Sequence, residues 1–214
     1  MKILSAFILT TVLACSQKQQ TKKHIPDPKA KQLYDSAIII AMQKQNFEGA
    51  ISLLDQATRI DSNYFAAYNN KLSFQFSLER FNDALATAKN LIRISPKSPN
   101  SYFLTGVLLD KTGDSINAKK YYDESLKRTD SVLDNMDRSK QKYDDALMGK
   151  GIILIFLEQQ QKGNEILKNL YDKQKDSLRK EMYSQFLNKS RQEILESIFS
   201  GNVTSTAAEP TIKD

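Results

Sequence analysis

Residues 65–98 read FAAYNNKLSFQFSLERFNDALATAKNLIRISPKS, and the spacing within this stretch recurs on both sides of it. Tyr34, Tyr68 and Tyr102 are evenly spaced, at an interval of 34. The same interval separates three alanines, which are Ala50, Ala84 and Ala118. Self-similarity at a fixed interval of this size is the mark of a repeat architecture. The sequence therefore predicts an array of similar units.

Each unit has the pattern of two helices. Apolar residues recur at spacings of three and four, the spacing of one helical face, at Tyr34, Ala37, Ile38 and Ala41 and again at Ala50, Leu53, Leu54 and Ala57. Asn46 and the pair Gly113–Asp114 mark turns between such helices, and Pro96 marks the end of the second unit. Glycine is rare and strand-like alternation is absent, so we expect an all-α fold.

These columns resemble the tetratricopeptide repeat, whose units are about 34 residues long and carry small and aromatic residues at fixed positions. The resemblance implies a short helix-turn-helix solenoid with repeats over about 31–64, 65–98, 99–137 and 143–172. The residues expected to pack the repeats together are Tyr34, Ala50, Tyr68, Ala84, Tyr102 and Ala118. A generic helical bundle is the alternative.

The fourth unit departs from the interval. Gly163 stands where the small residue is expected, but it follows Ala118 at an interval of 45 instead of 34, which indicates an insertion in this unit. A partly apolar stripe over 176–199 predicts one further helix, which would cap the solenoid or dock a partner. Residues 201–214 lack periodicity and are expected to form a disordered tail.

The N-terminus has the pattern of an export signal. Lys2 precedes an apolar run over 3–13, which is shorter than the roughly 20 residues that a membrane-spanning helix needs. The run ends in Val12-Leu13-Ala14-Cys15, which resembles the bacterial lipobox and implies a signal peptide over 1–14 with lipidation of Cys15. An ordinary cleaved signal and an uncleaved anchor are the alternatives. Ser16, the residue after the cysteine, resembles the outer-membrane sorting pattern, which implies an outer-membrane lipoprotein of the cell envelope. The segment SQKQQ lacks the acidic run that some surface-exported lipoproteins carry, which favours an orientation toward the periplasm.

The positive charge of the chain is concentrated near this leader. The formal net charge is +6, of which residues 1–31 carry +5, with six lysines and one aspartate. Residues 15–31 are expected to form a flexible basic tether. It is either a soluble spacer or a segment that contacts anionic head groups. A nearly neutral folded part argues against a nucleic-acid partner.

The sequence offers little for catalysis or cofactor binding. His24 is the only histidine and Cys15 the only cysteine, so no zinc cluster or Ser-His-Asp set can be assembled. No glycine-rich phosphate loop is present. We therefore expect a non-catalytic protein without a metal or cofactor, although a carboxylate-only hydrolase stays possible at this stage.

What the resemblance does imply is a protein-binding groove, lined by the first helix of each pair. The positions that correspond to this lining are Ile39, Met42, Asn69, Asn70, Ser73, Phe76, Phe103, Val107 and Asp110. Phe76 and Phe103 are either aromatic anchors for a ligand or packing residues between neighbouring helices. Some repeats of this family bind the C-terminal carboxylate of a peptide with lysines, an arginine and asparagines, and Asn70 corresponds to one of these positions. We expect no such carboxylate clamp here, because the other positions hold no basic residue: Asp35, Ile39, Asn100 and Leu104.

The function that follows is a lipid-anchored adaptor or scaffold, which binds a protein or peptide ligand near the membrane. The groove is expected to prefer an extended or helical protein segment of apolar character. A structural subunit of an envelope complex and a regulator of an envelope hydrolase are the alternatives.

Overall fold

The computed structural model describes residues 24–199. The expected signal peptide, the lipidation site Cys15 and the tail over 201–214 lie outside the described residues. Within 24–199 every regular element is an α-helix. The helices are α1 (Pro28–Lys44), α2 (Phe47–Ile60), α3 (Phe65–Ser77), α4 (Phe81–Ile94), α5 (Pro99–Lys111), α6 (Ser115–Asp134), α7 (Gln141–Phe156), α8 (Gln160–Lys173), α9 (Ser177–Ser184) and α10 (Arg191–Phe199).

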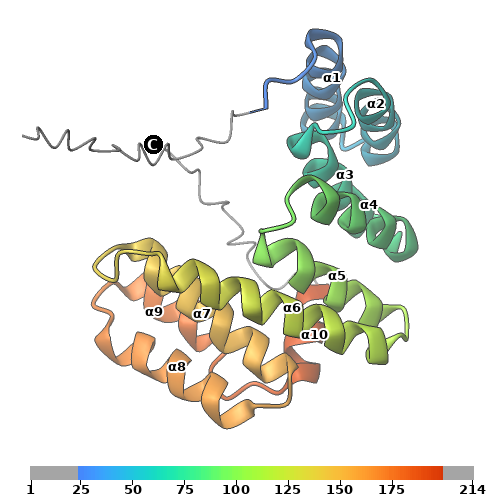
Figure 1. Ribbon diagram of the computed structural model, residues 1–214. Coiled ribbons are helices and arrows are strands. Elements are labelled where there is room, and N and C mark those ends of the chain that lie inside the picture. Colours follow the sequence, from blue (N-terminus) through green and yellow to red (C-terminus); the bar gives the residue numbers. More distant parts are fainter. Residues whose placement is uncertain (1–23, 200–214) are drawn as a thin grey trace, which may run out of the picture.

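Successive helices form pairs that stack one after another, as Figure 1 shows for α1/α2, α3/α4, α5/α6 and α7/α8. Each pair also packs on the next, through α2 with α3, α4 with α5 and α6 with α7. The buried apolar residues fall into one cluster around the first repeat, one around the second and one that joins the third and fourth repeats. The expectation of an all-α helix-turn-helix solenoid is confirmed.

The small-residue column is buried in all four repeats. Ala50, Ala84 and Ala118 are fully buried. Gly163 continues the column in the fourth repeat, because a Cβ atom there would lie 2.5 Å from the backbone oxygen of Gly151. A side chain larger than hydrogen therefore cannot be accommodated between α7 and α8 without moving the backbone.

The array begins earlier than the sequence interpretation placed it. A tether through residue 31 is wrong, because α1 already starts at Pro28. Asp27 is the N-cap and accepts hydrogen bonds from the backbone N–H groups of Lys29, at 2.8 Å, and Ala30, at 3.2 Å. An aspartate N-cap followed by proline at the first helical position is a strong helix start. The basic segment between Cys15 and α1 is correspondingly shorter.

The expectation of one helix over 176–199 is also wrong. Two helices, α9 and α10, are separated by residues 185–190, in which Asn188 adopts a positive φ of 61°. α10 then starts at a reciprocal capping box: Glu193 N–H donates to Ser190 Oγ at 3.2 Å, and Ser190 N–H donates to Glu193 Oε2 at 2.8 Å. α9 packs on α8 at the end of the solenoid, whereas α10 turns back toward α5.

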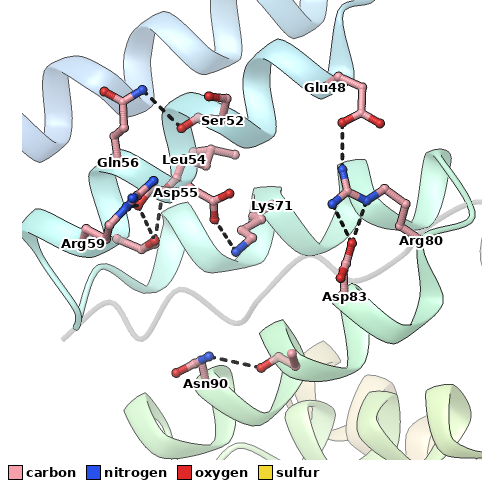
Figure 2. A network of polar contacts seen from close by, with 12 residues as sticks. Glu48, Ser52, Leu54, Asp55, Gln56, Arg59, Lys71, Arg80, Asp83 and Asn90 are labelled. Carbon is pink, nitrogen blue, oxygen red and sulfur yellow. Dashed lines mark hydrogen bonds and ion pairs between the residues drawn. The ribbon is translucent and has the colours of Figure 1, made fainter.

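Polar contacts on the surface join the first two repeats (Figure 2). Lys71 on α3 forms an ion pair with Asp55 on α2 at 2.5 Å, and Arg80 bridges Glu48 at 2.7 Å and Asp83 at 2.6 Å. Exposed ion pairs of this kind contribute at most about 1 kcal/mol each. Their role is therefore to fix how one repeat lies on the next, while the buried columns provide the stability.

Candidate protein-binding face

The candidate face is built from two columns of equivalent residues on the first helices of three repeats. Ile39, Ser73 and Val107 recur at the interval of 34, and Met42, Phe76 and Asp110 recur at the same interval about one helical turn further on. They lie on α1, α3 and α5, near the C-terminal end of each helix. We call these six positions the first-helix face.

α10 covers part of the first-helix face through an ion pair in the third repeat. Arg191, the first residue of α10, places Nη2 2.5 Å from both carboxylate oxygens of Asp110 on α5. The Asp110 side chain is only 4% exposed. Tyr122 on α6 donates its hydroxyl to the same carboxylate at 2.5 Å, so the buried charge is matched by a guanidinium and by a second donor.

The protonation of this cluster follows from its burial and charge. Desolvation alone would lower the pKa of Arg191, but the hydrogen bond to Asp110 and the negative charge of that residue raise it overall. Burial and the bond to Asp110 raise the pKa of Tyr122 well above its ordinary value. Arg191 therefore stays charged and Tyr122 stays a hydrogen-bond donor over the physiological pH range.

The other end of α10 lies on the second repeat. The ring of Phe199 stacks on Phe76 of α3, with centroids 5.7 Å apart and an interplanar angle of 6°. It also meets Phe81 of α4 edge-on at 5.1 Å. Lys111 Nζ lies 4.7 Å from the centroid of the Phe199 ring, within the range of a cation–π interaction.

These contacts fix the path of α10. Arg191 contacts the third repeat, and its Nη1 lies 3.9 Å from Oε1 of Glu158 in the fourth repeat. Phe199, at the other end of the helix, contacts the second repeat. Ile194, between them, is buried in the same apolar cluster as Val107. α10 thus crosses the face against the order of the repeats, from the fourth toward the first; Figure 1 shows it (red) behind α5 and α6.

The expectation that Val107 and Asp110 line an open groove is therefore wrong. Val107 is fully buried, and Asp110 is paired with the chain's own Arg191. Phe103 packs between helices, with its ring 5.0 Å from Phe156 on α7 and 5.7 Å from Tyr122 on α6. Phe76 does act as an aromatic contact, and the ring that it contacts is Phe199 of the same chain.

The first-repeat end of the face is open. Ile39 is 51% exposed and Met42 is 79% exposed, although both are large apolar side chains. Asn69 and Ser73, on α3 of the next repeat, are also exposed. The side-chain amide of Asn70 already has hydrogen-bond partners within the chain: it donates to the hydroxyl of Tyr34 at 3.0 Å and to the backbone oxygen of Ala66 at 3.1 Å. The structure thus separates the nine expected groove residues into an open group and a covered group.

Sequence reasoning missed the part that Tyr122, Arg191 and Phe199 play in this face. A signal for part of it was available: Ser190-Arg191-Gln192-Glu193 has the capping-box pattern, which predicts a helix start at that point. No local pattern indicates that Arg191 meets Asp110, because the two lie far apart in the chain, on α10 and α5.

Two further properties of residues 24–199 bear on function. Over this range, no three His, Cys, Asp or Glu side chains gather in a way that could hold a metal ion. In the same range, no helix combines the length and the apolar character that crossing a bilayer requires.

One family model matches the third repeat. Residues 99–131, which are α5 and most of α6, match the tetratricopeptide repeat family. No curated protein matches the chain.

Among solved structures, a MamA protein is 14% identical with a TM-score of 0.48, and the match covers 81% of this chain and 84% of that one. The Yersinia enterocolitica type III secretion chaperone SycD in complex with a peptide of the translocator YopD is 14% identical with a TM-score of 0.47, over 64% of this chain and 95% of that one. The first tetratricopeptide domain of Spaghetti (RPAP3), bound to an HSP90 peptide, is 17% identical with a TM-score of 0.42, over 57% of this chain and 94% of that one.

The third repeat therefore matches the tetratricopeptide repeat, and the fold of residues 24–199 is an all-α helix-turn-helix solenoid of that type. Among the described helices, α6 is the longest and leads into the fourth repeat, and α10 returns over the first-helix face.

Proposed function

We propose that this chain is a lipid-anchored protein of the bacterial envelope that binds another protein on its first-helix face, without catalysis. The observation that carries the proposal is the exposure of Ile39 and Met42. The equivalents of Met42 in the second and third repeats, Phe76 and Asp110, both contact α10. The Met42 column is thus covered by α10 in the second and third repeats and open in the first. Apolar residues exposed together commonly mark interaction sites.

The chemistry of the open end indicates what it would bind. Ile39 and Met42 supply apolar contact, while the exposed Asn69 and Ser73 supply hydrogen-bond donors and acceptors. Methionine is flexible and polarizable, and it adapts to partners of different shape. A protein segment with apolar side chains on one face fits this surface.

The proposed location rests on the N-terminal sequence. An apolar run that ends in Val12-Leu13-Ala14-Cys15 supports lipidation of Cys15. More than one acyl chain is needed for stable anchoring. The segment from Ser16 to Asp27 would then connect the lipid to α1. This anchor would hold a bound protein close to the membrane.

The test is affinity capture from cross-linked envelopes of cells that produce the full chain. Three variants are compared with the unaltered protein: Cys15→Ala, the double variant Ile39→Asp with Met42→Asp, and Ile116→Asp. Ile116 is the matched control, because it is 80% exposed but lies at the start of α6, outside the first-helix face.

We expect a partner that is captured by the unaltered chain and by Ile116→Asp, and that is lost from the Ile39/Met42 variant. Cys15→Ala should move the protein from the membrane fraction to the soluble fraction. Equal capture by the Ile39/Met42 variant would contradict the proposed surface. A membrane-bound Cys15→Ala protein would contradict the lipid anchor.

A further inference from the structure

α10 lies on the first-helix face in the way that a bound helical peptide would lie there. It is joined to the solenoid through the non-helical residues 185–190, and it lies across the first helices instead of stacking at the end of the array. We propose that α10 is an exchangeable occupant of this face, and that the partner of the chain is an amphipathic helix of the same chemistry that replaces it. This inference rests on the proposed function and names the class of partner and the regulation of its site.

The contacts of α10 define the pattern that such a partner helix would carry. A basic residue meets the buried Asp110, an aliphatic residue three positions later enters the apolar cluster beside Val107, and an aromatic residue eight positions after the first stacks on Phe76. In α10 these residues are Arg191, Ile194 and Phe199. An acidic residue at the first position would instead meet Asp110 and be repelled, so the face selects for charge as well as for apolar character.

α10 is held more loosely than the helices beneath it. Ile194 is its only fully buried residue, whereas α5 buries six. α10 has nine residues, and an isolated helix shorter than about 12–15 residues is marginal in water. Elements with few buried contacts open at a lower free energy than the core of a protein. α10 can therefore leave while the helix pairs remain stacked.

A partner helix has an advantage that α10 lacks. The contacts of α10 end at Phe76 in the second repeat, and the equivalent position in the first repeat is the exposed Met42. A longer helix on the same path would make the contacts of α10 and would also cover Met42 and Ile39. This additional contact can offset the high effective concentration of α10, which is attached to the same chain.

The test measures binding of a fluorescent peptide with the sequence of residues 187–199 to the full chain. The chains compared are the unaltered protein, the double variant Arg191→Ala with Phe199→Ala, and that variant with Asp110→Asn added. Circular dichroism and thermal melting establish that each chain is folded. A peptide with Arg191→Glu is the matched control for charge.

We expect the peptide to bind the Arg191/Phe199 variant at least tenfold more tightly than the unaltered chain, because the attached α10 no longer competes. Addition of Asp110→Asn, or use of the Arg191→Glu peptide, should weaken that binding at least tenfold. Equal affinity for the unaltered chain and the Arg191/Phe199 variant, or no binding to either, would overturn the inference.

A second measurement needs no variant. Hydrogen exchange on the unaltered full chain should show α10 amides exchanging at least tenfold faster than α5 amides, and equal protection would show that α10 does not leave. Failure of the proposed function is distinguishable, because peptide exchange can be observed even if the envelope capture yields no partner.

Discussion

Asp61 joins the residues just before α1 to the first repeat through its carboxylate. Its side chain lies after α2 and is 8% exposed. It accepts hydrogen bonds from His24 Nε2 at 2.8 Å, from Asp27 N–H at 3.1 Å and from Asn63 N–H at 3.0 Å. One residue thereby orders the segment before α1 and the turn between the first two repeats.

The pH dependence of this contact can be derived from its surroundings. Burial alone would raise the pKa of Asp61, but the hydrogen bonds from Asp27, His24 and Asn63 outweigh it and hold the pKa below the ordinary value. A carboxyl with a depressed pKa in the folded state adds stability above its unfolded pKa of about 3.9, and loses it as the pH falls through the folded pKa.

We therefore expect Asp61→Asn to destabilise the protein by about 1.5–3 kcal/mol at pH 7, the usual contribution of hydrogen bonds to a charged group. The difference between the variant and the unaltered chain should shrink as the pH is lowered from about 5 toward 3. Urea unfolding across this pH range is the measurement, with the exposed Asp134→Asn as a control. A difference that does not vary with pH would contradict the depressed pKa.

At the residue scale, sequence columns identified the packing positions better than the binding positions. Ala50, Ala84 and Ala118 are fully buried, because a close contact between helices imposes the same small residue in every repeat. Asp110 occupies the column of Met42 and Phe76, and its charge gave no indication that it is buried. Its partner Arg191 comes from outside the repeats, so the repeat interval carries no information about it.

At the scale of the elements, α7 and α8 meet through two glycines. A Cβ at Gly163 would lie 2.5 Å from the oxygen of Gly151 and 2.7 Å from Ile155 Cγ1. A Cβ at Gly149, in the same helix as Gly151, would have nothing within 4 Å. Substitution of Gly163 tests close packing between helices, and substitution of Gly149 tests the general effect of replacing a glycine in a helix.

We expect Gly163→Ala to destabilise the protein by roughly 1–3 kcal/mol, the usual cost of overpacking. Gly149→Ala should stabilise it by about 0.5–1 kcal/mol, because alanine in a helix loses less conformational entropy than glycine. Thermal melting of both variants is the measurement. Stabilisation by Gly163→Ala would contradict the close approach of α7 and α8.

The start of α10 depends on its capping box. Ser190→Ala removes the hydroxyl that accepts from Glu193 N–H, and loss of an N-cap costs about 0.5–2 kcal/mol. Because α10 is only loosely buried, we expect faster hydrogen exchange in α10 with little change in the exchange of α5. Ser184→Ala, at the end of α9, is the control. Uniform loss of protection throughout the array would show that α10 is instead an integral part of its core.

The elements of the regular array could be predicted from the sequence, and those after it could not. Helix pairs recur because each repeat buries residues at equivalent positions, such as Ala50, Ala84 and Ala118. Over 176–199 the apolar stripe is continuous enough to suggest one helix, but Asn188 and the Ser190–Glu193 capping box divide it. The hydrogen bonds of the capping box start a new helix there, although the apolar spacing continues.

At the scale of the whole molecule, the chain is an array with a helix folded back over it. The stacking of the pairs follows from contacts between neighbours in sequence, which is why the solenoid could be predicted. The position of α10 follows from contacts between residues far apart in the chain, such as Arg191 with Asp110 and Phe199 with Phe76. Because such long-range contacts leave no periodic signal, the open and covered parts of the first-helix face became visible only in the structure.

The most direct test of this account is a double-mutant cycle of unfolding free energies for Phe76→Ala and Phe199→Ala in the full chain. Stacked aromatic pairs contribute about 0.5–1.5 kcal/mol beyond the area they bury, so we expect a coupling energy of that size. The control cycle pairs Phe199→Ala with Phe47→Ala, because Phe47 on α2 stacks on Phe74 of α3 and not on Phe199, so its coupling should be near zero. A coupling near zero for the Phe76/Phe199 cycle as well would show that α10 does not lie on the first-helix face.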